Sequence, residues 1–427
     1  MSEILGSVVE RPQRGAAGLG LRIAWRNLWR NARRTWLTAG GVAFAVFLVV
    51  LSMCIQLGSY EMMEENATSL LIGHLQLQNA DYVDSDRLED TLADATALLD
   101  VVRRTRGVVA AAPRLEAFAL ASAGERSFGA QVLGVDPVAE RAVVDFERRI
   151  VAGRNVASGE EGLLGEGLAR NLGVTPGDEV VVLGTGKEGG VAALVLKVVG
   201  TFRTGLADLD RALLLLPIAT MRDAFGLGDE VHSIAVRTDK LAHVGRVAER
   251  IAAAVVHIPR TDVRVRPWWE VLPELRQAIE VDRLSGSLFY WLIMILVAFS
   301  AVNTFIMTVF ERTREFGMLL AIGMRPARIM RMLQWEALFL WALGAAIGLG
   351  LALAVVGWLM RAGISLGGGL EQLATQMYVP TRLYPSFAPA AMITAPLVLL
   401  IGTQLAALIP ALRIRHLAAA AALRVAA

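Results

Sequence analysis

Residues 284–310 read LSGSLFYWLIMILVAFSAVNTFIMTVF, and no side chain in this stretch carries a charge. A helix needs roughly 20 apolar residues to cross the hydrocarbon core of a bilayer, so the stretch predicts a transmembrane helix. Three further charge-free stretches of similar length occupy residues 35–60, 337–360 and 383–412. Hydrophobic residues make up 55% of the 427 residues and charged residues only 19%, which is unusual for a soluble protein. The sequence therefore predicts four transmembrane helices.

Arginine is concentrated in three of the segments that flank these stretches. Seven arginines precede the first stretch, five lie in the connection 311–336, and three follow the last stretch in the tail 413–427. The positive-inside rule places these segments, and hence both termini, in the cytoplasm. Residues 61–283 and the short connection 361–382 then lie outside. The large outer segment carries 34 Asp and Glu against 25 Lys and Arg, so no nucleic acid partner is expected.

The cytoplasmic segment 1–34 is predicted to contain a helix that lies in the lipid headgroup layer. Residues 21–36 read LRIAWRNLWRNARRTW, which places tryptophan and leucine on one helical face and arginine on much of the rest. A plain positively charged flank is the alternative. The apolar run that follows is longer than the core of a signal peptide and has no small-residue cleavage site after it. We therefore expect an uncleaved anchor.

The outer segment 61–283 is predicted to be an α+β domain. Hydrophobic periodicity indicates two βαβ halves, at about 74–114 and 233–266, which together suggest a split ferredoxin-like layer. Short alternating runs and glycine-rich turns between them, at about 116–228, predict a β-rich insertion. The expected fold class is thus a four-helix membrane protein with an α+β domain outside the membrane.

Residues suited to catalysis or metal binding do not form a recognisable pattern. Cys54 is the only cysteine, and the five histidines show no spacing typical of metal ligands. No nucleophile and base stand at a characteristic spacing, so no catalytic residue and no metal site are predicted. An enzyme is the least favoured class.

The connection 311–336 reads ERTREFGMLLAIGMRPARIMRMLQWE and is the most specific stretch of the chain. Gly323 interrupts its helical pattern, and Pro326 is suited to the first turn of a new helix. A short helix with arginine and exposed apolar side chains, held between two spans, suits docking to a soluble partner. Movement of that partner would move both spans. A positively charged turn that only obeys membrane topology is the alternative.

This connection resembles the signature of the FtsX/MacB-like permeases of ABC transporters. The resemblance extends over most of the chain, and some of it favours the LolC/LolE-type lipoprotein-releasing permease subunits within that family. The segments that carry it are ERTREFGMLLAIGMRPARIMRMLQWEAL at 311–338, PALRIRHL at 410–417, AWRNL at 24–28, GEGLARNLGVTPGD at 165–178, GTFRTGLADLD at 200–210, and, for the subgroup, HLQLQ at 74–78 and GVDP at 134–137 with Glu140.

The resemblance implies a subunit of the bacterial inner membrane that binds no cofactor itself. It would work with a second permease subunit, identical or different, and with two separate ATPase subunits that bind ATP and Mg, because no Walker-type loop occurs in the sequence. The helix from about Met324 to Met332 would be the coupling helix between ATPase and membrane. The residues expected to couple to the ATPase are Glu311, Arg312, Arg314, Glu315, Gly323, Met324, Arg325, Arg328, Ile329 and Met332.

The implied activity is mechanotransmission, in which the ATPase moves the outer domain to extract lipoproteins or other hydrophobic cargo from the membrane, with a periplasmic carrier or adaptor as a further partner. Efflux of small molecules or peptides and regulation of a cell-wall hydrolase are the alternatives. The loop 184–190 is too short and polar to capture a carrier directly. Candidate cargo contacts between the first two spans, for which ordinary helix packing is the alternative, are Met53, Leu57, Met62, Met63, Leu288, Leu292 and Ile295.

Overall fold

The computed structural model describes residues 25–26, 28–30, 32–80, 82, 88–144, 146–204, 207–256, 258, 262–365 and 382–413. It divides into two compact units. We call Met1–Gly58, Val281–Ile364 and Tyr384–Ala427 the helical unit, and Ser59–Glu280 with Ser365–Leu383 the globular unit. Most of the predicted segment 1–34, most of the connection 361–382 and nearly all of the tail 413–427 lie outside the described residues.

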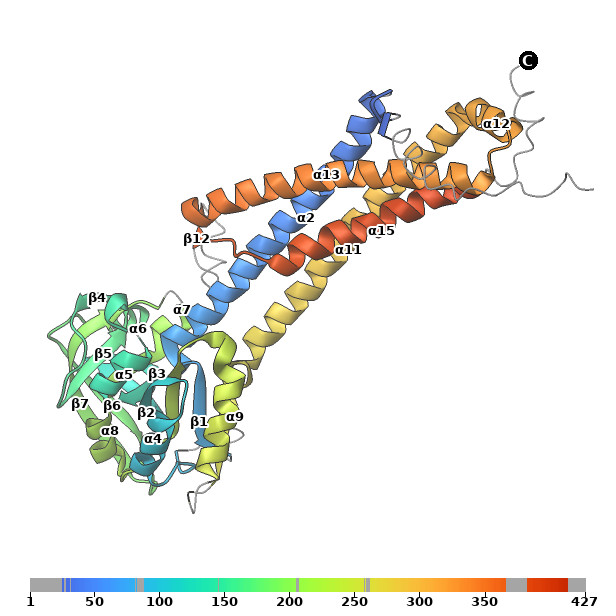
Figure 1. The fold of residues 1–427 in the computed structure, drawn as a ribbon. Coiled ribbons are helices and arrows are strands. Elements are labelled where there is room, and N and C mark those ends of the chain that lie inside the picture. Colours follow the sequence, from blue (N-terminus) through green and yellow to red (C-terminus); the bar gives the residue numbers. More distant parts are fainter. Residues whose placement is uncertain are drawn as a thin grey trace, which may run out of the picture. The chain divides into compact units, whose positions relative to one another are not determined.

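Four long helices account for the helical unit and confirm the four predicted apolar helices within the part of the chain that the structure describes (Figure 1). The first two continue beyond the charge-free stretches into the globular unit. The fourth begins later than residue 383, because β12 (Arg382–Leu383) pairs with β11 (Ile364–Ser365) and Pro389 opens the helix. The four helices are α2 (Ala32–Ala67), α11 (Pro273–Glu311), α13 (Pro326–Ala362) and α15 (Pro389–Arg413).

Two glycines let α13 approach α2 closely. A Cβ atom added to Gly344 would lie 2.6 Å from the carbonyl oxygen of Ala39, and one added to Gly348 would lie 2.3 Å from that of Ala43. The four-residue spacing places both glycines on one helical face, as in other membrane helix pairs that pack through small residues. Helix α13 also contacts α15, because the indole N–H of Trp341 donates to the carbonyl oxygen of Pro396 at 2.8 Å.

A ten-stranded sheet forms the globular unit. Its strands follow the order β10-β1-β9-β2-β3-β8-β5-β7-β4, and β6 pairs with both β2 and β7. The strands are β1 (Leu75–Asn79), β2 (Val108–Ala123), β3 (Arg126–Val135), β4 (Ile150–Gly153), β5 (Glu161–Gly165), β6 (Glu179–Thr185), β7 (Val191–Phe202), β8 (Leu213–Pro217), β9 (Ser233–Thr238) and β10 (Val263–Pro267).

Strand β1 follows α2 in the chain, and β10 precedes α11. Both belong to the part of the sheet with the order β10-β1-β9-β2, in which every neighbouring pair is antiparallel. Helices α4 (Ala95–Arg104) and α9 (Val244–Val255) pack together on these strands. Their inward stripes bury Leu98 and Val102 on α4, and Val247 and Ile251 on α9, against Leu77 of β1. This 3.6-residue periodicity on both helices explains why each covers the sheet with one face.

The inserted part, from β3 to α8, contains parallel as well as antiparallel strand pairs. A buried ion pair joins it to β2, because the guanidinium of Arg114 donates to the carboxylate of Glu140, with Nε 3.2 Å from Oε2. Asp136 caps the helix that carries Glu140, and Pro137 occupies its first turn. The helices here are α5 (Pro137–Val143), α6 (Glu166–Leu172), α7 (Ala207–Ala212) and α8 (Ile218–Phe225).

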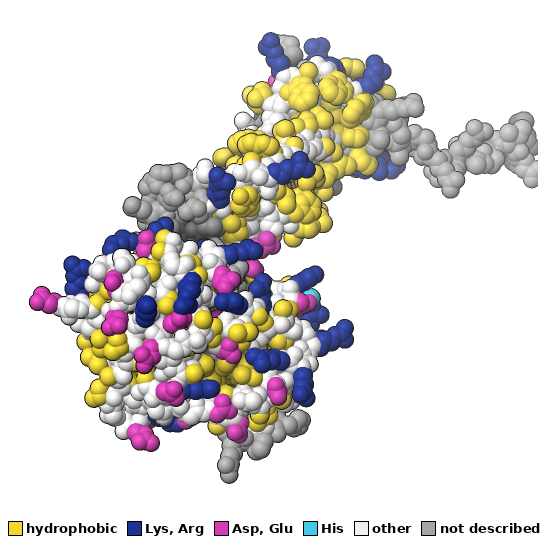
Figure 2. Space-filling view, turned by 90° about the vertical axis from the view of Figure 1, so that its left-hand side faces the viewer, with side chains coloured by type: hydrophobic (Ala, Val, Ile, Leu, Met, Phe, Trp, Pro, Cys, Tyr) yellow, Lys and Arg dark blue, Asp and Glu magenta, His cyan; other side chains and the backbone are white. Residues whose placement is uncertain are grey.

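The two units differ in the surface that they expose. Figure 2 shows mainly hydrophobic side chains over the helical unit and interspersed charges over the globular unit. On α11, for example, Leu284, Leu292 and Phe299 are 66%, 64% and 73% exposed. Such an apolar surface is stable only in a lipid environment or against another apolar surface.

Candidate functional site

The chain makes a compact turn between α11 and α13. Helix α11 ends at Glu311, the short helix α12 (Thr313–Ala321) follows, and Gly323 turns the chain with φ +94°. Arg325 is then the N-cap residue of α13, and Pro326 is its first residue. Figure 1 shows α12 at the end of the helical unit where α11 and α13 meet. The backbone at Gly323 lies in the left-handed region, which favours glycine.

This turn exposes apolar side chains between arginines. Met318 and Ile322 are 52% and 79% exposed, and the side chains of Arg314, Arg325 and Arg328 are exposed beside them in the chain. We call these five residues the α12 tip. Exposed aliphatic side chains flanked by arginine are typical of a protein interface, since arginine pairs with carboxylates while the apolar groups lose their contact with water.

The sequence-based prediction of a separate helix from Met324 to Met332 is wrong. Pro326 begins a helix, but that helix is α13 itself and continues to Ala362. Ile329 and Met332 are 0% and 7% exposed and pack in a cluster with Phe316 of α12. These two candidate coupling residues are therefore buried against α12 and do not face solvent. The short helix between the spans is α12.

Behind the tip, Arg312 joins α12 to α13 from a largely buried position. Its Nη1 donates to Oε2 of Glu336 at 3.2 Å, and its Nε donates to Oε2 of Glu315 at 2.9 Å. The guanidinium also lies over the ring of Phe316, 5.3 Å from the ring centroid, at a distance suited to a cation–π contact. Arg312 is therefore a structural connection between the two helices.

Two arginines before the first span complete this network. Arg34 donates to Glu311 at 2.9 Å, and Arg30 pairs with Glu315. Burial would raise the pKa of the Glu315 carboxyl, but the hydrogen bonds from Arg312 and Arg30 lower it below its ordinary value. Of the predicted coupling residues, Arg312 and Glu315 thus hold α12 against its neighbours, and Glu311 joins the end of α11 to α2. Met318 and Ile322 were not singled out from the sequence, although Met318 stands on α12 and Ile322 is its C-cap residue.

Tryptophans surround this end of the helical unit. Trp25, Trp29 and Trp36 are each about half exposed, whereas Leu28 between them is buried. The ring of Trp25 meets that of Phe339 edge to face at 5.5 Å. Tryptophans of this kind mark the boundary between lipid and water in membrane proteins. Residues 21–24 of the predicted headgroup helix lie outside the described residues.

The candidate cargo residues are divided between the two units of the structure. Met53 and Leu57 pack at the edge of the core that α2 shares with α13 and α15. Leu288, Leu292 and Ile295 are instead exposed on α11, at 71%, 64% and 54%. The remaining two belong to the globular unit, where Met63 is buried with Trp268 and Met62 lines a cavity.

Metal ligands do not cluster in the part of the chain that the structure describes, where no group of three or more His, Cys, Asp or Glu side chains could hold an ion. His74 is buried in the globular unit, and its Nδ1 accepts from the backbone N–H of Thr238 at 3.2 Å. Burial first, and then Arg237, lowers the pKa of His74 to about 4. His74 is therefore a neutral structural residue.

Four apolar helices form the helical unit, the α12 tip lies between the second and third of them, and the globular unit lies between the first and second in the chain, an arrangement typical of a membrane permease. Residues 35–254 match the family model of the MacB-like periplasmic core domain, and residues 287–419 match that of the FtsX-like permease C-terminal domain. The chain belongs to this family of ABC transporter permeases. It is accordingly an inner-membrane protein whose globular unit lies in the periplasm.

Relatives of two kinds are found. The lipoprotein-releasing system transmembrane protein LolC of Neisseria meningitidis serogroup B is 29% identical over 283 residues, which cover 64% of this chain and 67% of LolC. The macrolide export ATP-binding/permease protein MacB of Nitrobacter winogradskyi is 28% identical over 354 residues, which cover 79% of this chain and 52% of MacB. The periplasmic region of MacB from Actinobacillus actinomycetemcomitans superposes with a TM-score of 0.34 at 16% identity, over 49% of this chain and 94% of that structure.

Proposed function

We propose that this chain is the permease subunit of a lipoprotein-releasing ABC transporter that works by mechanotransmission. The observation that carries the proposal is the α12 tip, an exposed Ile322 and Met318 among arginines on a short helix connected to three other segments. The similarity to LolC supports release of lipoproteins as the activity. The chain itself binds no nucleotide.

The first step is docking of a separate ATPase on the α12 tip. A shallow acidic pocket on that ATPase would accept Ile322 and pair with Arg325 and Arg328. Two such ATPase subunits, with their ATP and Mg, would serve this chain and a second permease subunit. This arrangement requires the tip, and with it both termini, to face the cytoplasm, as the arginine-rich flanks also indicate.

The second step is transmission along the helices. Arg312 and the arginines before the first span fix α12 to its neighbours, so force on the tip acts on α11, α13 and α2 together. Helices α2 and α11 are continuous as far as the globular unit. There, Tyr60 and Met63 of α2 pack with Leu275 and Ile279 of α11 around Trp268. We call this packed cluster the joint.

The third step is movement of the periplasmic domain above the joint. We assign β10-β1-β9-β2 with α4 and α9 as a split ferredoxin-like layer, supported by the antiparallel order in which β1 and β9 lie between β10 and β2. Both β1 and β10 lie next to the joint in the chain. The layer would therefore follow the movement of α2 and α11, and the β-rich insertion would move with it.

Hydrophobic cargo would meet the exposed stripe of α11. Leu288, Leu292 and Ile295 lie on one face with Phe299, and all four side chains are more than half exposed. Acyl chains, membrane lipid or the second permease subunit could cover this stripe. Loop 184–190 would not capture a carrier, because it is held against the rest of the domain. The ammonium of Lys187 binds Glu230, and the backbone N–H of Lys187 donates to the carbonyl oxygen of Phe225 at 3.0 Å.

Copurification of this chain with ABC ATPase subunits from its native membranes tests the proposal. Ile322→Asp should abolish the association, because it places a carboxylate in the centre of the tip. Val256→Asp in the globular unit is the matched control, since Val256 is 78% exposed against 79% for Ile322. If Ile322→Asp and Val256→Asp both copurify with the ATPase like the wild type, docking does not use the α12 tip.

Efflux of small molecules or peptides is the second candidate function. The similarity to MacB covers 79% of this chain, a larger share than the 64% covered by LolC. The two functions differ in what ATP hydrolysis releases. Proteoliposomes that hold an acylated lipoprotein should lose it to a periplasmic carrier under the first function and retain it under the second.

A further inference from the structure

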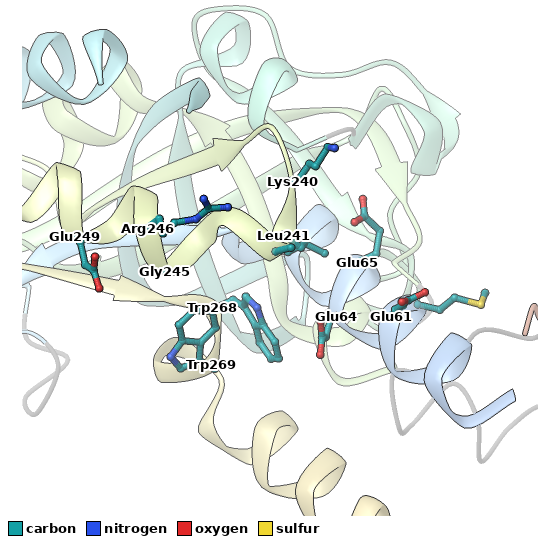
Figure 3. Close-up of a pocket in the computed structure, with 12 residues that line it drawn as sticks. Glu61, Glu64, Glu65, Lys240, Leu241, Gly245, Arg246, Glu249, Trp268 and Trp269 are labelled. Carbon is teal, nitrogen blue, oxygen red and sulfur yellow. The ribbon is translucent and has the colours of Figure 1, made fainter. Parts of the chain in front are cut away.

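A cavity of about 970 Å³ lies in the globular unit beside the joint, and the steps proposed above do not use it. The outer end of α2 forms one wall, and the segment that opens α9 forms the other (Figure 3). Leu241, Trp268 and Trp269 lie between the two walls. All of these residues belong to the globular unit.

The wall formed by α2 is acidic. Glu61, Glu64 and Glu65 stand at i, i+3 and i+4 in α2 and all line the cavity, with the side chains of Glu64 and Glu65 pointing in different directions (Figure 3). Helix α2 runs directly into the π-helical segment Thr68–Ile72, so the three carboxylates lie more than one turn before the end of the helical segment. Carboxylates at these spacings repel one another, and a cation in the cavity would relieve that repulsion.

The opposite wall carries two cations and one carboxylate. Lys240 precedes the 3-10 turn Leu241–His243 that leads into α9, Arg246 lies in the first turn of α9, and Glu249 follows one turn further on. Within the described chain, no carboxylate oxygen lies within 4.0 Å of the charged group of Lys240 or Arg246. The N-terminus of a helix attracts anions. An anion in the cavity would therefore be favoured beside Lys240 and Arg246, and a cation beside the α2 wall.

Two tryptophans lie between the walls. Trp268 and Trp269 meet edge to face with their ring centroids 5.9 Å apart, and a tryptophan ring attracts an ammonium group over its face. Glu61 directly follows Tyr60, the last residue of the first charge-free stretch. Because a helix rises about 1.5 Å per residue, the acidic wall begins close to the edge of the hydrocarbon core. The cavity therefore opens at the depth of lipid headgroups.

We propose that this cavity binds a zwitterionic headgroup of the phosphoethanolamine type, carried by a membrane phospholipid. The primary ammonium lies against Glu61, Glu64 and Glu65, to which it offers three hydrogen-bond donors. The phosphate lies against Lys240 and Arg246 at the start of α9, where side-chain cations and helix N–H groups are suited to it. A bound headgroup would link α2 to α9 across the joint. The proposal does not depend on which cargo the transporter carries.

Binding of short-chain lipids to the full chain in detergent, followed by native mass spectrometry, tests this assignment. Dihexanoylphosphatidylethanolamine should bind saturably and at least about tenfold more tightly than dihexanoylphosphatidylglycerol, which lacks the ammonium. Glu61→Gln combined with Glu65→Gln should remove that preference. The control is Glu160→Gln combined with Glu188→Gln, which makes the same charge change at two exposed positions away from the cavity. It should bind like the wild type.

Four results would overturn the proposal. Equal binding of the two lipids to the wild type would show that the ammonium is not recognised, and an unchanged preference in the Glu61/Glu65 variant would remove the acidic wall from the site. Glycerophosphoethanolamine, which has no acyl chains, must bind more weakly than the lipid, since equal affinity would indicate a free phosphoamine as ligand. If the double variant does not fold, Gly245→Leu replaces it. The new side chain would start 3.8 Å from the Trp269 ring and fill the cavity, so unchanged lipid binding by Gly245→Leu would exclude the site.

Discussion

Replacing Arg312 by methionine should destabilise the helical unit strongly. The side chains of Arg312 and Glu336 are only 10% and 5% exposed, with Nη1 3.2 Å from Oε2. Methionine retains much of the apolar stem but leaves Glu336 buried with no other hydrogen-bond donor among the described residues. Loss of one member of a buried ion pair costs about 3–5 kcal/mol. For a unit of this size, the midpoint of thermal unfolding should fall by roughly 6–20 °C.

Companion variants separate the buried charge from the loss of contacts. Arg312→Met combined with Glu336→Leu replaces the pair by apolar side chains and should return to within about 1–2 kcal/mol of the wild type. Arg30→Met breaks a pair whose side chains are 56% and 40% exposed, and it should cost less than about 1 kcal/mol. Thermal unfolding of the full chain in detergent, followed by circular dichroism, measures all three. The reasoning is refuted if Arg312→Met melts like the wild type, or if the double variant is as unstable as Arg312→Met alone.

Two further predictions concern the helix packing and the globular unit. Gly348→Ala should destabilise the chain by about 1–3 kcal/mol, because the new Cβ would clash with Ala43. Gly350→Ala, with nothing within 4 Å of the new Cβ, should stabilise α13 by up to about 1 kcal/mol. Equal melting temperatures of the two variants would contradict the close α2–α13 contact. Because His74 has its pKa lowered to about 4 from an ordinary 6.5, protonation favours the unfolded state, so the stability of the globular unit should fall by about 3 kcal/mol as the pH drops from 6.5 to 4. Hydrogen exchange of the backbone amides of β1 measures this stability. His74→Asn should remove most of its pH dependence, and an unchanged dependence would show that another group titrates.

The spans could be predicted from the sequence because hydrocarbon excludes charge, and a charge-free stretch of sufficient length has few other interpretations. The position of the short helix between the second and third spans was harder to predict. Pro326 was correctly read as a helix start, but no glycine or proline occurs between Pro326 and Gly344 to end that helix before the membrane. The burial of Ile329 then depends on a tertiary contact with Phe316, which local periodicity does not contain.

The cargo candidates show a second limit of sequence reasoning. Helix α11 is apolar on every side, so hydropathy does not indicate which face packs against α2 and which stays exposed. The structure places Tyr290, Ile293 and Met294 against the core and leaves Leu288 and Leu292 outside. In the globular unit, β4 and β5 are four or five residues long and contain glycine, which obscures the alternation by which longer strands are recognised.

The central claim is that a tip on the cytoplasmic side drives a domain on the periplasmic side. Labelling of single cysteines tests it most directly, because Cys54 is the only cysteine and Cys54→Ser gives a background free of others. A membrane-impermeant maleimide should label Ile322→Cys only in inverted membrane vesicles and Val256→Cys only in intact spheroplasts. Labelling of both positions from the same side would contradict the account.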